Sequence, residues 1–195
     1  MRWLITLVIV SCVLIWLGGG CGKPAAETNA QMQVGEPTKG LTSFVAGTWQ
    51  MRDGVFRFVI EPNGVVSSAV IPLMECTIRP HQTTYVPMKD GNVSDFTGGD
   101  MFAEYDPVTR ELSLYIELKN FLIRFFDIRT GGSQVDRFFG PVSEDGSVWI
   151  CDWFSMFDYG PDFPVDYNEI GTSPCIFDKV EEYKPPQKPD KKPGG

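Results

Sequence analysis

Between residues 41 and 174 the chain alternates short apolar runs with strong turn signals, and this pattern constrains the fold more than any other feature. The runs recur about every ten residues, and none shows the periodicity of an amphipathic helix. The sequence therefore predicts an all-β fold in which an antiparallel meander closes into a small barrel, with a β-sandwich as the second choice. The expected strands are 48–51, 55–60, 65–71, 76–78, 83–87, 101–105, 111–117, 122–128, 134–139 and 147–153.

The segments between these runs carry the chemistry of tight turns. Pro62 presets a negative φ, and Asn63 and Gly64 accept the positive φ that a reversal needs. Similar signals predict reversals at 89–92, 106–110, 131–132 and 144–146.

Alternation predicts which faces are buried. In residues 111–118 the even positions are aliphatic and the odd positions are mostly polar, which indicates a strand with one face in the core. Residues 121–126 (FLIRFF) are apolar on both faces except at Arg124, so we expect them to be covered on both sides or to line an apolar lumen.

The first expected strand opens with Gly47-Thr48-Trp49. A glycine allows the chain to bend tightly into a strand, and an indole is large enough to close one end of a small barrel. This Gly-x-Trp motif resembles the opening motif of lipocalins. The resemblance implies a cup-shaped barrel whose end is closed by Trp49 and whose cup holds a small apolar ligand.

The N terminus has the pattern of an export signal. Arg2 precedes an apolar run over residues 3–17, and three glycines then lead to Cys21. The run is shorter than the roughly 20 residues of a spanning helix, which predicts a signal peptide over residues 1–20. Small residues before Cys21 resemble the lipobox of bacterial lipoproteins. The resemblance implies palmitate or other acyl chains on Cys21 and a membrane-anchored domain in the cell envelope, in the periplasm or outside. An ordinary secretory signal and an uncleaved anchor are the alternatives.

Composition divides the remaining chain into three parts. Residues 21–40 are polar and rich in Gly and Pro, which predicts a flexible tether with a root-mean-square reach of roughly 25 Å. Residues 41–183 form the expected all-β domain. Residues 184–195 form a Pro- and Lys-rich tail, which we expect to be a solvated tail or to contact an acidic polymer of the cell wall.

The net charge argues against two classes of binding partner. The formal charge of −8 becomes −9 without residues 1–20, because Arg2 is their one charged side chain. Nucleic acids and anionic lipid surfaces favour clustered cations, so neither is an expected partner. The expected partners are the membrane, through the N-terminal lipid, and a small ligand or an envelope protein.

Three cysteines remain when Cys12 leaves with the signal and Cys21 is lipidated. At most one internal disulfide can then form, and Cys151 can pair with Cys175 or with Cys76. A metal site that uses Cys76, His81 and the other thiols lacks the usual ligand spacing, so we expect neither a metal nor a cofactor.

Aromatic and acidic residues interleave between residues 149 and 167. Flat apolar rings beside hydrogen-bond acceptors suit a sugar, and rings alone suit a small apolar molecule. The alternative is a loop whose rings form local core over one barrel end. The candidate ligand-binding residues are Trp149, Trp153, Phe157, Tyr159, Asp158 and Asp162.

The same segment suggests two further chemistries. Asp158, Asp162 and Asp166 recur every fourth residue, although not in the alternating pattern of a calcium loop. Asp152 with Asp158 or Asp162 would serve glycoside hydrolysis if the two carboxyls lay about 5 to 10 Å apart. We expect a non-enzymatic binding lipoprotein; a purely structural lipoprotein and a carboxylate-dependent hydrolase are the alternatives. A lumen lined by Phe56, Phe58 and Phe125 would favour the binding protein, and a barrel packed solid with those side chains would count against it.

Overall fold

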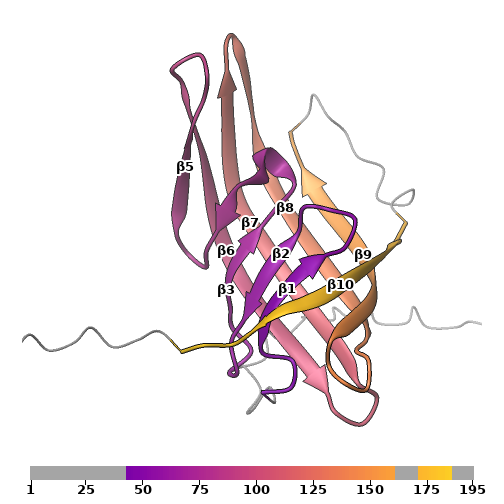
Figure 1. Cartoon of the computed structure of the whole chain (residues 1–195). Helices are drawn as coiled ribbons and strands as arrows, with labels where there is room; N and C mark the ends of the chain where they lie inside the picture. The colour runs from indigo at the N-terminus through magenta and orange to yellow at the C-terminus, as the bar shows by residue number, and fades with distance from the viewer. Residues whose placement is uncertain (1–42, 161–170, 186–195) are drawn as a thin grey trace, which may run out of the picture. The chain divides into compact units, whose positions relative to one another are not determined.

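The computed structural model describes residues 43–160 and 171–185, and these form one antiparallel sheet of ten strands (Figure 1). One short 3₁₀ turn, Leu73–Glu75, interrupts the meander. The strands are β1 Gly47–Met51, β2 Arg57–Ile60, β3 Val66–Val70, β4 Thr77–Ile78, β5 Thr83–Pro87, β6 Val93–Asp106, β7 Glu111–Phe125, β8 Ile128–Pro141, β9 Val148–Asp158 and β10 Ser173–Glu182.

Strand order shows how the sheet curls into a barrel. Its order is β4-β3-β2-β1-β10-β9-β8-β7-β6-β5, so β1 pairs with β10 and the two edges are β4 and β5, which are consecutive in the chain. Across the seam between these edges the Thr84 hydroxyl donates to the Thr77 carbonyl at 2.8 Å. Nearby, the Ala103 amide donates to the Gly64 carbonyl at 2.7 Å. The sheet is therefore nearly closed, and the predicted all-β meander with a barrel-like form is confirmed.

The sequence prediction is wrong in the middle of the chain. Residues 111–117 and 122–128 are not two strands, because β7 runs from Glu111 to Phe125 with an irregular register between Leu118 and Phe121. The chain reverses at Phe126, which has a φ of 51°. The turn expected at 131–132 lies inside β8, where a Cβ on Gly132 would come within 2.1 Å of the Asp158 carbonyl oxygen. This glycine permits a close approach of two strands rather than a reversal.

The sequence pattern does not predict the last strand, β10. Its inner face carries Phe177 and also Lys179, whose charge disguises the alternation. The Lys179 ammonium is nevertheless covered, and it donates to the Phe44 carbonyl at 2.9 Å and to the Glu182 carboxylate at 2.8 Å. A lysine with its charge satisfied in this way can occupy an inward position.

A solid aromatic cluster fills one part of the barrel. Phe58 lies 5.1 Å from Phe138 and 5.2 Å from Phe177, measured between ring centroids. Phe56 and Phe58 are almost entirely inaccessible, so they adjoin no space that would hold a water molecule. They pack against other rings instead of lining a lumen, and the side chain of Phe125 is outside the described residues. The cluster consists of Trp49, Phe56, Phe58, Phe138, Trp149 and Phe177.

The Gly47-Thr48-Trp49 motif has a clear packing role. Gly47 has a φ of 144°, and a Cβ there would come within 2.4 Å of the Glu181 carbonyl oxygen on β10. Trp49 is fully buried, its indole N–H donates to the Val45 carbonyl at 2.9 Å, and its ring meets Trp149 edge to face. The glycine thus lets β10 approach β1, and the indole fills the space beneath.

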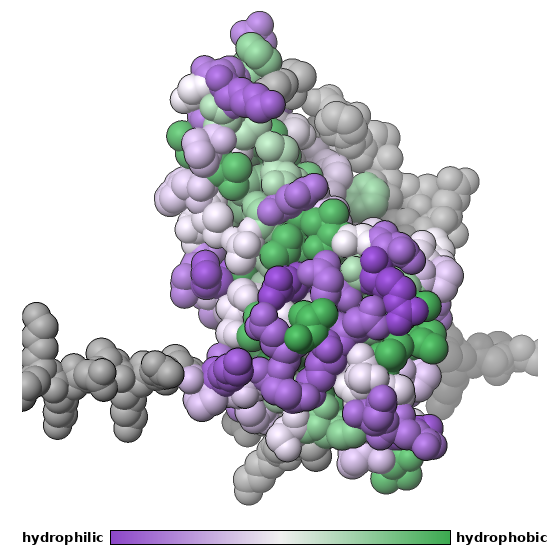
Figure 2. All heavy atoms as spheres, in the orientation of Figure 1, coloured by the Kyte–Doolittle hydropathy of each residue, from purple (hydrophilic) through white to green (hydrophobic). Residues whose placement is uncertain are grey.

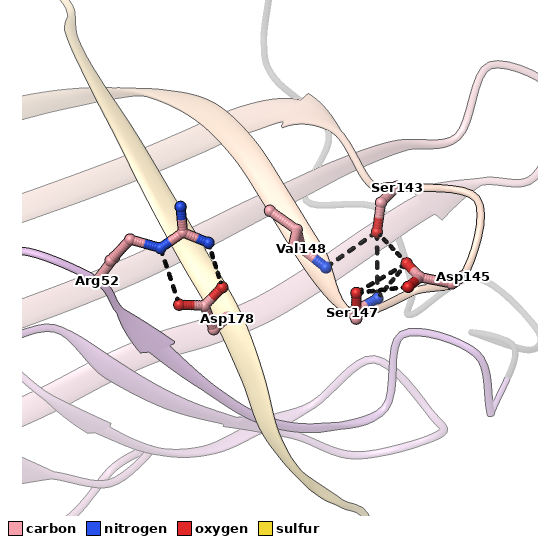
Figure 3. A network of polar contacts seen from close by, with 6 residues as sticks. All are labelled: Arg52, Ser143, Asp145, Ser147, Val148 and Asp178. Atoms are coloured by element: carbon pink, nitrogen blue, oxygen red, sulfur yellow. Dashed lines mark hydrogen bonds and ion pairs between the residues drawn. The ribbon is translucent and has the colours of Figure 1, made fainter.

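Polar contacts secure the turn between β8 and β9 and the end of β1 (Figure 3). Asp145 accepts hydrogen bonds from the hydroxyls of Ser143 and Ser147 at 2.6 and 2.8 Å, and these donors lower the pKa of Asp145 to about 2. Arg52 donates to both carboxylate oxygens of Asp178 at 2.6 and 3.0 Å. On the face drawn in Figure 2, hydrophilic residues separate the hydrophobic ones into small patches.

Candidate functional site

Inward-facing polar residues on β8 and β9 follow directly after the aromatic cluster. Along β8 the inner face carries Phe138, then Asp136, then Gln134, as the strand is followed away from the β8–β9 turn. Each of these residues has a partner directly opposite on β9. The pairs are Phe138 with Trp153, Asp136 with Ser155, and Gln134 with Phe157. The two strands therefore bring a carboxylate, an amide and a hydroxyl among aromatic rings inside the barrel.

Asp136 is the centre of this group. Only 2% of its surface is exposed. Its Oδ1 accepts a hydrogen bond from the Trp153 indole N–H at 2.9 Å, and both carboxylate oxygens lie within hydrogen-bond distance of Gln134 Nε2, at 3.1 and 3.0 Å. Burial raises the pKa of Asp136, while the hydrogen bonds from Trp153, Gln134 and Ser155 lower it, and burial is the larger effect.

The hydrogen bonds continue toward solvent through Gln134. Its Oε1 accepts a hydrogen bond from the Tyr159 hydroxyl at 2.9 Å. Burial is the main cause that raises the pKa of Tyr159, and the nearby charge of Asp136 adds to it. We call this set the inner polar cluster: Gln134, Asp136, Trp153, Ser155 and Tyr159.

Aromatic rings lie on both sides of the inner polar cluster. The Tyr159 ring is 4.7 Å from Phe157 and 5.3 Å from Phe121, the latter edge to face. On the other side the Trp153 ring meets Phe56 edge to face at 5.3 Å. Trp153, Phe157 and Tyr159 are half-buried, whereas Asp136 is covered. The described residues thus place aromatic rings on both sides of one buried carboxylate.

The six candidate ligand-binding residues differ in where they lie in the structure. Trp153, Phe157 and Tyr159 lie together at the inner polar cluster. Trp149 lies in the aromatic cluster with no exposed surface, and its indole N–H donates to the Gly140 carbonyl at 3.0 Å. Asp158 is exposed and accepts a hydrogen bond from the Gly160 amide at 3.0 Å. Asp162 is outside the described residues.

Sequence reasoning missed Gln134, Asp136 and Ser155. Polar residues in an alternating strand are ordinarily assigned to the solvent face. The adjacent rings of Phe138 and Phe139 also make the alternation ambiguous, since either could be the inward one. With Phe138 buried and Phe139 exposed, counting back in steps of two from Phe138 reaches Asp136 and then Gln134.

Of the two carboxylate pairs proposed for hydrolysis, Asp152 with Asp158 does not fit the structure. Asp152 and Asp158 both occupy outward positions of β9, six residues apart. A strand rises about 3.3 Å per residue, which separates them by roughly 20 Å, far more than a glycosidase pair allows. Asp162 and Asp166 are outside the described residues, and in the described part of the chain no group of acidic, His or Cys side chains has the arrangement of a metal site.

Cys151 and Cys175 lie directly opposite each other on β9 and β10. Their Sγ atoms are 3.2 Å apart, and both residues carry free thiols, as does Cys76. Burial raises the pKa of Cys76 to about 11, so this thiol is unreactive. Of the two pairings that the sequence left open, the structure brings together the thiols of Cys151 and Cys175.

The fold and the inner polar cluster define an antiparallel meander barrel with a buried carboxylate on its inner face. Comparisons with family models, curated proteins and solved structures find no match to this chain. Among the described residues, no helix has the length and apolar character needed to cross a membrane.

Proposed function

We propose that the protein is a lipid-anchored, non-enzymatic binding protein of the cell envelope, and that its barrel binds a small apolar or sugar-like ligand at the inner polar cluster. The observation that carries this proposal is Asp136, a covered carboxylate that lies between half-buried aromatic rings. Burying a carboxylate costs free energy even when it is hydrogen-bonded, and packing alone does not require it. Apolar sites with a few convergent polar groups are typical of ligand binding.

The side chains around Asp136 suit such a ligand. The rings of Phe157 and Tyr159, 4.7 Å apart, supply the kind of aromatic surface that apolar carbons or the C–H face of a sugar favour. The Tyr159 hydroxyl donates to Gln134, which leaves its oxygen lone pairs to accept a hydrogen bond from a ligand hydroxyl. The polar groups therefore orient the ligand, and the rings contribute most of the contact area.

Binding is testable with the neutral apolar fluorophore N-phenyl-1-naphthylamine. We expect Phe157→Ala in the full chain to weaken its binding about tenfold, because removing one stacking ring costs roughly 1 to 2 kcal/mol. Phe154→Ala is the matched control, since this neighbouring ring lies on the outer face of β9. Equal affinities for the wild type and both variants would contradict binding at the inner polar cluster.

Native mass spectrometry would identify the chemical class of the ligand. The full chain is extracted gently from its own membrane, and a bound small molecule is sought as an added mass. We expect Phe157→Ala to lose that mass and Phe154→Ala to retain it.

The membrane anchor is proposed from residues 1–40, which are outside the described residues. Acylation of Cys21 supplies about 0.8 kcal/mol per buried methylene, and more than one chain gives stable attachment. We expect Cys21→Ser to release the processed protein from the membrane fraction, while Cys12→Ser leaves it there. A Cys21→Ser product that is still processed and membrane-bound would refute the lipid anchor.

The second candidate is a purely structural envelope lipoprotein. The solid packing of the aromatic cluster favours it, because Phe56 and Phe58 leave no room for a ligand at that level of the barrel. Contact with an envelope protein would then use outward side chains such as Phe139 and Ile150, which are exposed on β8 and β9. The absence of both fluorophore binding and a co-purified molecule would select this candidate.

A further inference from the structure

The two thiols opposite each other on β9 and β10 have a use that ligand binding does not require. We propose that Cys151 and Cys175 form a thiol–disulfide exchange site, in which the two thiols are oxidised to a cross-strand disulfide by a disulfide-bearing oxidant.

The backbone already holds the two residues at the right separation. Cys151 and Cys175 are cross-strand partners in the β9–β10 ladder. Directly opposed residues in an antiparallel pair have Cα atoms about 4.5 or 5.5 Å apart, and both distances fall in the range that a disulfide spans. With Sγ atoms 3.2 Å apart, bond formation needs a side-chain adjustment of about 1 Å and no strand movement.

The environments of the two thiols differ, which sets the order of attack. Cys151 is buried, whereas Cys175 is half-buried and so more accessible. Either Sγ can donate in the contact between the two thiols, and Cys175 Sγ also donates to the Cys151 carbonyl at 3.5 Å. The contact lowers the pKa of Cys175, while the same contact and burial raise the pKa of Cys151. Asp152 opposes ionisation of both thiols, but it is not the leading cause for either. Cys175 is therefore the attacking thiol, and Cys151 is the resolving thiol.

The exchange balances with a disulfide as the oxidant. The Cys175 thiolate attacks one sulfur of the incoming disulfide, which forms a mixed disulfide and releases one thiolate. Cys151 then attacks Sγ of Cys175, which forms the cross-strand bond and releases the second thiolate. The two protons lost by the cysteines end on the two released thiols, so the oxidant gains the two electrons that the protein gives up.

This site adjoins the inner polar cluster. Cys151 precedes Trp153 by two residues on β9, so both side chains occupy the same inner face of that strand. Oxidation would fasten β9 to β10 beside Trp153. We therefore expect the tryptophan fluorescence of the full chain to change when the disulfide forms.

The test uses the full chain, purified in detergent and reduced, with glutathione disulfide as the probe. After oxidation and acid quenching, free thiols are alkylated and disulfide-linked peptides are mapped by mass spectrometry. We expect a link between Cys151 and Cys175, with Cys76 alkylated. A link that joins Cys76 to either residue, or no link, would overturn the proposal, and this measurement needs no variant to fold.

Two variants then test the order of attack. Cys151→Ser removes the resolving thiol, so a glutathione adduct should accumulate on Cys175. Cys175→Ser leaves the covered Cys151, which should form the adduct at least about tenfold more slowly. Circular dichroism melts of both variants check that the fold is retained. Equal adduct rates in two folded variants would overturn the assignment of Cys175 as the attacking thiol.

Discussion

Replacing Trp153 with Phe tests how the barrel accommodates the Asp136 carboxylate. The substitution keeps an aromatic ring but removes the indole N–H that donates to Asp136 Oδ1 at 2.9 Å. Because Asp136 is 2% exposed, water does not replace the lost donor. A hydrogen bond to a charged group contributes about 1.5 to 3 kcal/mol, and the smaller ring loses packing as well. We expect Trp153→Phe to lower the free energy of unfolding at pH 7 by about 2 to 4 kcal/mol.

The pH dependence of this loss of stability distinguishes the lost hydrogen bond to the Asp136 carboxylate from the lost packing of the indole ring. Burial raises the pKa of Asp136, so its contribution to stability is fully present below the ordinary carboxyl value of about 4 and is lost as pH rises through the folded pKa. The Trp153 hydrogen bond lowers that pKa and so limits the loss. Without it the pKa rises further, and Trp153→Phe should therefore cost more stability at pH 7 than at pH 4.

Urea unfolding followed by circular dichroism measures the effect, with stability taken from midpoints at constant slope. Trp149→Phe is the matched control, since its indole N–H donates to the neutral Gly140 carbonyl at 3.0 Å. We expect the cost of Trp149→Phe to be the same at both pH values. If Trp153→Phe were equally independent of pH, the ionised Asp136 would not depend on this donor, and the reasoning would fail.

Three further predictions concern the frame of the barrel. Gly47→Ala should lower the free energy of unfolding by about 1 to 3 kcal/mol, because a Cβ would come within 2.4 Å of the Glu181 carbonyl oxygen at a φ of 144°; chemical denaturation measures this, and a neutral effect would contradict the close approach. Phe58→Ala should cost about 3 to 5 kcal/mol in the same assay, against less than about 0.5 kcal/mol for a change at an ordinary surface position; a small loss would show that the aromatic cluster is loosely packed. The lowered pKa of Asp145, about 2, means that its contribution is present above pH 4 and is lost as pH falls toward 2; Asp145→Asn should remove this part of the acid dependence in thermal melts, and an unchanged profile would contradict it.

Much of the architecture could be predicted because its determinants are local. Alternation in residues 111–118 identifies the buried face of β7, and Leu112, Leu114 and Ile116 are indeed buried. Turn chemistry at 61–64, 89–92 and 144–146 places reversals where the structure has them. Pro and Gly act through their own backbone preferences, so their effect is visible without neighbours. The glycines at 131–132 led to a wrong turn prediction. They are needed where neighbouring strands approach closely, and a local sequence pattern does not show that approach.

The candidate site could be predicted only in part. Trp153, Phe157 and Tyr159 stand out in sequence because aromatic residues are dense there. Asp136 does not stand out, since a carboxylate in a polar segment is ordinarily a surface residue. Its burial depends on Trp153 and Gln134, which reach it from β9 and from two residues away on β8.

Short-range sequence patterns are sufficient to specify an all-β meander, most of its turns and the inward face of β7, because periodicity and turn propensity belong to short stretches of chain. Three other features depend on contacts between distant parts of the chain. Pairing of β10 with β1 and β9 nearly closes the barrel, and the same pairing sets Cys175 against Cys151. The register of β8 against β9 gathers the inner polar cluster around Asp136. Each of these features depends on which strands meet and in which register, and that is decided by burial over the whole sheet.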